Sequence, residues 1–472
     1  MRNSAQMSQG ANIDIADCFP IHNLPPEILG EIFHLCIERS LPRPVITEAP
    51  LKLGRICRYW RKLVLSDPSL WCRLSLRRDT AERNVSLDLE ILDEWLVRSQ
   101  RAPLWLSMRY SATPSAYHEI DRVIAKIIPH YYRWQYLELR IPTACLSPII
   151  STLSECPTIV KFLRLAATSP DRTGDGPLNI DLSRQSYLTD LTMYDTRLQL
   201  VKNHGAMHTI RTLKLECPTV HDYFKCLDLC PSVEEVRLSF DVLIDFRPSI
   251  HPSIHTLPSI RTLALAAYTF GYDGTMDDIG LFIECLQLPG LYELELGPGT
   301  FTRHSEQWTY LSELLERSGH PPLKSLKIRI PIPLDEFCAC LRKAPGLEVL
   351  RAPSILFVNP TLDTLTRRLH PDQPFVCPQL RRVELDYCNP VACEATAELV
   401  LRRWCGTEMD ADPSDCSIST VVLKIFRDNK VDPFLYYPGI RQCIKDGLLV
   451  TSCDRQGHKT VYTYDHSKFS SE

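Results

Sequence analysis

Long apolar runs and an excess of one charge are both missing from this sequence. No uninterrupted apolar stretch reaches the roughly 18 residues that a membrane-crossing helix needs. The polar residues 1–20 hold no apolar core of signal-peptide length. With 53 Lys and Arg against 57 Asp and Glu, the net charge is −4, which gives no field for attraction to nucleic acid or to an anionic membrane. We therefore expect a cytoplasmic or nuclear protein that binds neither nucleic acid nor membrane.

Catalytic motifs are missing as well. The chain contains no G-x-S-x-G elbow, no G-x-x-x-x-G-K-[ST] loop and no H-E-x-x-H pair. The closest cysteine pairs, Cys338 with Cys340 and Cys226 with Cys230, have no matched second pair for zinc. Each pair lies in a stretch of helical period, so core packing is the favoured interpretation. We expect no metal, no cofactor and no catalytic residue, although a nucleophilic cysteine with a distant histidine stays open as an alternative.

The composition indicates a folded chain of more than one unit. The apolar share is 44%, which is ordinary for a folded protein. A chain of 472 residues is too long for a single compact core, so two units or an elongated repeat is expected. The 19 cysteines show no regular spacing and mostly replace apolar residues, which predicts free thiols in a reducing compartment.

Two short amphipathic helices are predicted near the N-terminus. Pro25 and Pro26 suit the first positions of a helix, and apolar residues follow at helical spacing: Ile28, Leu29, Ile32, Phe33, Cys36 and Ile37. A second stripe comprises Leu53, Ile56, Cys57, Trp60, Leu63 and Val64, opposite Lys52, Arg55, Arg58, Arg61 and Lys62. The dipeptide Asp67–Pro68 should end that helix. A core this small is marginal alone and would gain from another surface to cover it.

Three motifs in this region carry a family resemblance. The opening LPPEIL with IF, the central CRYWR and the closing DPSLW span residues 24–71. In this order they resemble the F-box, in the form common in fungal proteins, although the proline-bearing segment 40–50 is longer than the usual link. The resemblance implies binding to a Skp-type adaptor and, through it, to a cullin–RING ubiquitin ligase. The alternative is an ordinary helical hairpin that caps a larger domain. The adaptor-binding residues that the resemblance implies are Leu24, Pro25, Pro26, Ile28, Leu29, Ile32, Phe33 and Trp60.

A short strand-like unit recurs through the rest of the chain. Its ten copies begin at residues 136, 162, 190, 212, 235, 262, 293, 325, 349 and 382, with spacings of 22 to 33 residues. Several copies have a proline five residues before their first apolar position, and helix-period stretches lie between copies. These features resemble leucine-rich repeats, whose period falls in this range. An alternating α/β fold of another kind is the alternative, but the long apolar strands and glycine-rich turn of a doubly wound sheet are missing.

The predicted fold class is therefore α/β, a small helical F-box unit followed by an irregular leucine-rich-repeat solenoid. We expect a flexible leader at 1–22, the F-box-like helical domain at 23–76, the solenoid at 77–425, and a C-terminal cap and tail at 426–472. Because terminal repeats must hide their apolar edge, the last segment is interpreted as a cap that includes a hairpin.

The middle residue of each copy should point away from the core, because strand side chains alternate. This predicts an outward column of mixed charge that binds a protein target, beside an aromatic loop that could supply interface anchors. The predicted target-binding residues are Arg237, Glu295, Lys327, Tyr268, Phe270 and Tyr272. The hypothesis is a non-catalytic substrate receptor of a Skp–cullin–F-box ligase. A repeat scaffold without a ligase is the main alternative, and an enzyme with an unrecognised site is a third.

Overall fold

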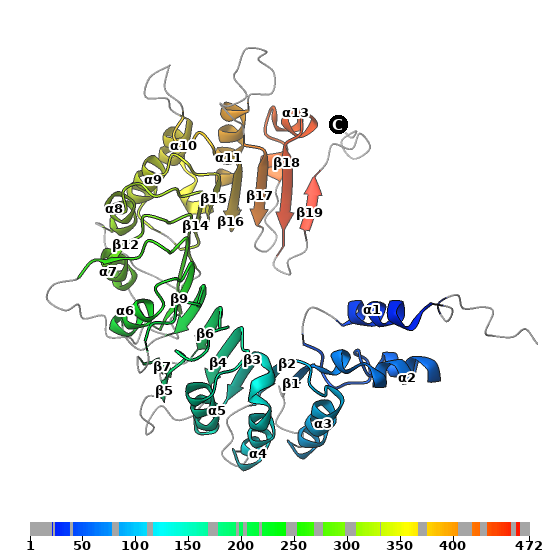
Figure 1. Ribbon diagram of the computed structural model, residues 1–472. Coiled ribbons are helices and arrows are strands. Elements are labelled where there is room, and N and C mark those ends of the chain that lie inside the picture. Colours follow the sequence, from blue (N-terminus) through cyan, green and yellow to red (C-terminus); the bar gives the residue numbers. More distant parts are fainter. Residues whose placement is uncertain are drawn as a thin grey trace, which may run out of the picture. The chain divides into compact units, whose positions relative to one another are not determined.

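The computed structural model describes most of the chain. The described residues are 21, 24–37, 41–77, 85–110, 117–168, 178–194, 198–201, 205–216, 220–241, 253–268, 277–297, 308–330, 332–366, 375–404, 418–424, 432–454 and 459–462. The protein is mixed α/β, built from helices and mostly parallel, open β-sheet (Figure 1). It divides into two compact units, residues 1–174 and 175–472.

Unit 1 contains a pair of helices followed by a four-stranded parallel sheet. Its α-helices are α1 (Pro26–Cys36), α2 (Arg58–Ser66), α3 (Val85–Arg98), α4 (Tyr117–Ile127) and α5 (Thr143–Glu155). Its strands are β1 (Arg73–Arg77), β2 (Leu104–Arg109), β3 (Trp134–Ile141) and β4 (Phe162–Ala167), which pair in chain order. Helices α3, α4 and α5 cover one face of this sheet (Figure 1).

The helical pair follows the sequence pattern with one difference. Helix α1 begins at Pro26 as expected. The second stripe is not one helix, because a 3₁₀ turn at Leu53–Arg55 is followed by a break at Cys57. Cys57 is extended, and its Sγ accepts a hydrogen bond from the Trp60 amide at 3.4 Å, so α2 starts only at Arg58. Asp67 ends α2 as predicted, and its Oδ1 accepts from the Ser69 amide at 3.0 Å.

Aromatic side chains connect the helical pair to the sheet. The Trp60 ring lies 4.8 Å from that of Phe33, between the two helices. Trp71 donates its indole N–H to the Val64 carbonyl at 2.8 Å and contacts Trp95 of α3 edge-on at 4.8 Å. Strand β1, at the C-terminal end of the segment expected as the F-box domain (23–76), pairs with β2. The helical pair and the first strands thus belong to one compact unit.

Unit 2 repeats a parallel strand and a helix. Its α-helices are α6 (Val220–Leu229), α7 (Asp277–Glu284), α8 (Tyr310–Arg317), α9 (Leu334–Lys343), α10 (Asn359–Thr366), α11 (Pro390–Arg403), α12 (Asp432–Leu435) and α13 (Ile440–Lys445). Its main strands are β6 (Asp190–Tyr194), β8 (Thr212–Glu216), β9 (Glu235–Asp241), β11 (Thr262–Tyr268), β13 (Glu293–Leu296), β14 (Ser325–Ile328), β15 (Val349–Pro353), β16 (Arg382–Asp386), β17 (Thr420–Lys424), β18 (Leu449–Cys453) and β19 (Lys459–Tyr462).

All ten recurring segments are β-strands, two in unit 1 and eight in unit 2. Within each unit, neighbouring copies pair in parallel and align position by position, so that Leu213 lies opposite Val236 and Leu294 opposite Leu326. These inward positions are fully buried beneath the helices. The predicted C-terminal hairpin is confirmed, since β18 and β19 are antiparallel, and β18 also extends the sheet by pairing with β17.

Two short parallel pairs lie outside the main sheet of unit 2: β5 (Leu178–Ile180) with β7 (Leu198–Leu200), and β10 (His255–Thr256) with β12 (Leu286–Gln287). The apolar residues Ile279, Phe282, Ile283 and Leu286 follow one another at helical spacing, which predicts a helix that includes Leu286. Instead α7 ends at Glu284, and Leu286 continues as strand because it pairs with β10.

Candidate functional site

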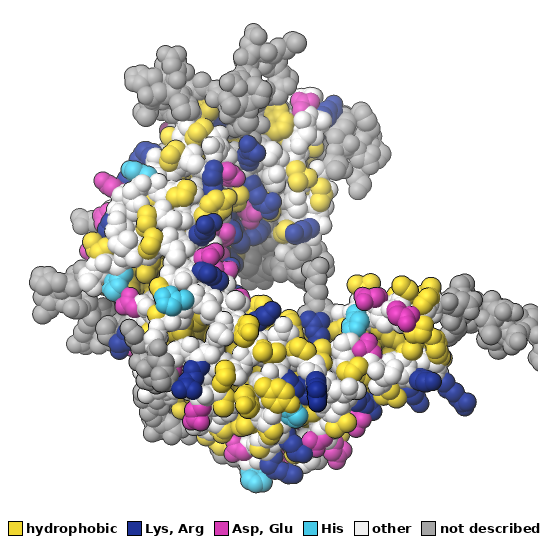
Figure 2. Space-filling model, viewed as in Figure 1, with side chains coloured by type: hydrophobic (Ala, Val, Ile, Leu, Met, Phe, Trp, Pro, Cys, Tyr) yellow, Lys and Arg dark blue, Asp and Glu magenta, His cyan; other side chains and the backbone are white. Residues whose placement is uncertain are grey.

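Helix α1 carries apolar side chains on two faces. The inner face buries Leu29 and Phe33 against α2. On the adjacent face Ile28 is 49% exposed and Leu35 is 84% exposed, with the half-buried Ile32 between them. A spacing of four and then three residues puts these three side chains on one stripe. Hydrophobic side chains are visible on this helical pair in Figure 2.

The residues expected to bind an adaptor thus fall into two groups. Pro25, Pro26 and Ile28 are exposed, and Leu24 and Ile32 are half-buried. The other three, Leu29, Phe33 and Trp60, lie inside the small core and would act on a partner only by holding the helices together. Sequence reasoning missed Leu35, which its seven-residue spacing from Ile28 could have shown. Other exposed apolar side chains on or beside α2 are Ile56, Tyr59 and Leu65.

A serine, a histidine and an aspartate meet beside the helical pair, but their geometry is structural. Ser69 Oγ lies 2.9 Å from His34 Nε2, and Asp67 Oδ2 lies 3.3 Å from the same nitrogen. In a catalytic triad the carboxylate orients the imidazole through its other nitrogen, which leaves the first free to take the serine proton. Here Ser69 and Asp67 both contact Nε2, while Asp67 also accepts a hydrogen bond from the Ser69 amide and so caps the turn there. The cluster ties the end of α2 to α1.

The face of each sheet opposite the helices is here called the open face. In unit 1 its centre is Glu138, which accepts hydrogen bonds from Arg109 at 2.6 Å and Ser107 at 3.0 Å, with Arg164 at 3.4 Å. Burial alone would raise the pKa of Glu138. The hydrogen bond and the positive charges of the two arginines outweigh burial, and the pKa of Glu138 lies below its usual value. Glu138 is therefore a fixed anion.

An aromatic row adjoins this cluster. Trp105 and Tyr136, opposite each other on β2 and β3, stack with ring centroids 5.4 Å apart and an interplanar angle of 5°. Phe162 of β4 continues the row at 6.2 Å from Tyr136. The guanidinium of Arg73 lies 4.7 Å from the centre of the Trp105 ring. This row gives unit 1 a partly exposed apolar band.

In unit 2 the predicted column is confirmed by the strand register. Arg237 lies opposite Ala264, Ala264 opposite Glu295, and Glu295 opposite Lys327. Basic and acidic side chains interleave on this face (Figure 2). Of the aromatic residues, the backbone of Tyr268 ends β11, whereas Phe270 and Tyr272 lie outside the described residues.

The charged groups of this column form ion pairs with charged residues beside the column. Arg237 pairs with Glu235 at 2.7 Å, and that hydrogen bond is the main cause that raises the pKa of the guanidinium. Lys327 pairs with Glu293, and Arg329 with Glu295 at 3.4 Å. The pairs of Lys327 and Arg329 reach from β14 and the residue after it to β13, whereas Arg237 and Glu235 both lie on β9.

Further along the open face, Arg351 donates two hydrogen bonds to Asp386, at 2.8 and 3.0 Å. Glu384 accepts from Arg382 at 2.6 Å and lies 3.6 Å from Lys424. The open face of unit 2 is therefore a network of matched charges. Such a network suits charge-complementary recognition more than attraction of one sign of ligand.

The four cysteines of the two closest pairs are packed in the core. Cys226, Cys230, Cys338 and Cys340 are all buried free thiols, and burial raises the pKa of Cys230 and Cys340, which disfavours the reactive thiolate. Over the described residues, no group of three or more His, Cys, Asp or Glu side chains is arranged to hold a metal ion. Within the same residues, no helix has the length and apolar character to cross a membrane.

No protein-family model matches the chain, and no curated protein matches it.

Proposed function

We propose that this protein is the substrate-recognition subunit of a Skp–cullin–F-box ubiquitin ligase. In this proposal the helical pair binds a Skp-type adaptor, and a leucine-rich-repeat-like solenoid captures the protein to be ubiquitinated. The observation that carries the first half is the apolar stripe of Ile28, Ile32 and Leu35 on the outer face of α1. A small helical unit that exposes such a stripe, next to a filled inner core, suits docking onto an apolar partner.

The second half is supported by the order of the strands. Strands from successive copies pair in parallel, and a helix lies between neighbouring strands in most copies, although no helix is described between β6 and β8 or between β9 and β11. Stacked units of this kind bury a continuous core and present one residue per strand on a shared face. The paired charges of the open face are then the proposed target-binding surface, with Arg237, Glu295 and Lys327 at its centre.

The adaptor half is tested by pull-down of a purified Skp-type adaptor with the full chain. Replacing Ile28 and Leu35 together by Asp should weaken adaptor binding at least about tenfold, because two charges would enter an apolar interface. The matched control is Val97→Asp, which changes an equally exposed apolar side chain on α3 (74% exposed). The double variant should melt like the wild type, since neither side chain belongs to the core.

Unchanged adaptor binding by the Ile28 and Leu35 double variant would reject this interface. If the folded wild-type chain binds no adaptor, the ligase assignment fails and a repeat scaffold without a ligase remains. Leu24→Ala with Pro25→Ala tests the start of α1 in the same assay, and a loss of adaptor binding is expected there too.

A further inference from the structure

The open face of unit 1 carries an excess of positive charge. Five charged side chains are described on β1 to β4, and four of them are arginines: Arg73, Arg109, Arg140 and Arg164, with Glu138 as the acid. They alternate along their strands with buried apolar residues, so all five lie on the open face. One negative charge balances only one of the four positive charges. This face therefore differs from the open face of unit 2, where charges of both signs pair.

Two of these arginines are neighbours on adjacent strands. Arg109 of β2 lies directly opposite Arg140 of β3. Arg109 and Arg164 both contact Glu138, at 2.6 and 3.4 Å, whereas Arg140 is exposed and has no ion-pair partner among the described residues. Like charges on neighbouring strands repel each other. A carboxylate bound beside both guanidinium groups would replace this repulsion by attraction.

The aromatic row lies at the other end of the same face. Trp105 and Arg109 are four residues apart on β2, which is roughly 13 Å along a strand. Tyr136 of β3 and Arg73 of β1 cover the Trp105 ring from its two neighbouring strands, so the ring edges are left for a partner. Nucleobases bind by stacking on ring faces, and Glu138 would repel phosphates. The row therefore suits an apolar side chain more than single-stranded nucleic acid.

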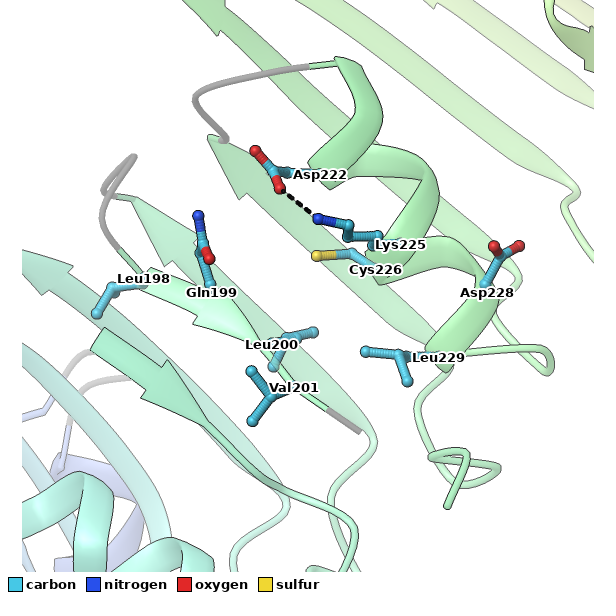
Figure 3. Close-up of a pocket in the computed structure, with 9 residues that line it drawn as sticks. All are labelled: Leu198, Gln199, Leu200, Val201, Asp222, Lys225, Cys226, Asp228 and Leu229. Carbon is cyan, nitrogen blue, oxygen red and sulfur yellow. Dashed lines mark ion pairs between the residues drawn. The ribbon is translucent and has the colours of Figure 1, made fainter. Parts of the chain in front are cut away.

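An extended segment can lie along this face, which distinguishes it from a cavity in unit 2. That cavity, of about 390 Å³, lies between β7 and α6 (Figure 3). The strand and the helix pack against each other there through the buried Leu200, Cys226 and Leu229, and Asp222 pairs with Lys225 at 3.5 Å. No extended chain fits between them. In unit 1 the helices α3, α4 and α5 cover the opposite face of the sheet (Figure 1).

We propose that the open face of unit 1 binds an extended segment of a partner protein that carries an apolar and an acidic residue. The apolar side chain contacts the edges of the aromatic row. The acidic side chain, roughly four residues away in the segment, binds between Arg109 and Arg140. The residues between them are not acidic, because Glu138 is a fixed anion and would repel a second carboxylate. This surface is separate from the helical pair and from the open face of unit 2, so the inference goes beyond the proposed function and does not depend on adaptor binding.

The first test selects random peptides, displayed on phage, on the full-length protein. The library is first depleted on the Arg140→Glu variant, which removes peptides that bind elsewhere on the chain. Enriched peptides should combine an apolar residue with an Asp or Glu roughly four positions away. A failure to enrich peptides, or enriched peptides without an acidic residue, would overturn the proposal.

Protein variants then test the position of the site with a synthetic copy of the best binder. Arg140→Gln should weaken its affinity roughly threefold, and Arg140→Glu roughly tenfold or more, because reversal adds repulsion to the lost attraction. The matched control is Arg122→Glu, which reverses an exposed arginine on α4 and should keep full affinity. Adaptor binding and the melting temperature should not change in any of these variants. Full affinity of Arg140→Glu for the peptide would refute the site.

A charge exchange tests the contact itself. A peptide in which Lys replaces the acidic residue should bind Arg140→Glu better than it binds the wild type, and the opposite order would refute the contact. A fluorescent single-stranded RNA of twelve uridines is measured against the same two proteins. Tight binding of this RNA to the wild type that Arg140→Glu abolishes would assign the face to nucleic acid and overturn the proposal.

Discussion

Leu294 and Glu295 are neighbours on β13 whose replacement should have very different effects. Leu294 is 1% exposed and lies opposite Leu263 on β11 and Leu326 on β14. Leu294→Ala removes three carbons, which at about 0.8 kcal/mol each is about 2.4 kcal/mol of burial free energy. The cavity that remains adds to this loss, because strands paired on both sides cannot close in. We expect a total loss of roughly 3–4 kcal/mol in the free energy of unfolding.

Glu295 provides the control on the same strand. Its side chain points to the open face and pairs with Arg329 at 3.4 Å. Such a partly exposed ion pair contributes less than about 1 kcal/mol, so Glu295→Ala should change stability little. Urea-induced unfolding, followed by far-ultraviolet circular dichroism, measures both variants. A loss below about 1 kcal/mol for Leu294→Ala, or equal losses for the two variants, would refute the assignment of inward and outward positions.

Three further predictions concern other parts of the chain. Trp60→Ala should lower stability by roughly 3–5 kcal/mol, and a normal melting curve would contradict its place in the core of the helical pair. The double variant Arg237→Glu with Lys327→Glu should weaken the affinity for the target protein. It should also lose about 1 kcal/mol of stability from broken ion pairs. An unchanged target affinity would place the binding site away from the open face. Burial raises the pKa of Glu336, so the folded state favours the protonated acid. The free energy of unfolding should therefore fall as pH rises from the unfolded-state pKa of about 4.3 through the raised pKa of the folded state. Glu336→Gln should flatten that fall when the free energy of unfolding is measured by urea titration at a series of pH values above the unfolded pKa, and an unchanged slope would assign the fall to other groups.

The strands could be predicted because their signal is local. In segments such as Thr212–Glu216 and Glu293–Leu296, apolar and polar residues alternate within four or five positions, and this alternation alone fixes which side chains face inward. Their pairing in order follows from the repeat, since a short crossover between parallel strands, in most copies a helix, returns the chain to the neighbouring position.

The helical pair was harder to predict because hydrophobic spacing does not show where a helix breaks. The stripe through Ile56 and Trp60 keeps its period across the turn before Cys57, and cysteine is not a typical N-cap. Helix α1 presents the same difficulty in another form. Both of its faces are apolar, and Phe33 is the buried one because it packs against Trp60 of α2, while Leu35 is exposed. That choice depends on a neighbour far along the chain.

Ion pairs of the open face join residues that are not directly opposite each other on neighbouring strands. The sequence does not show which of these side chains will meet. The register puts Arg351 directly opposite Glu384, yet the bidentate partner of Arg351 is Asp386, two residues further along β16. Glu384 accepts from Arg382 on its own strand, lies 3.6 Å from Lys424 on β17, and keeps only a longer contact of 3.9 Å with Arg351. The charges of this column, which are separate in the sequence, are therefore linked in the structure through shared ion-pair partners. A partner that binds here must offer its own charges in a complementary order, because displacing one member leaves another unpaired.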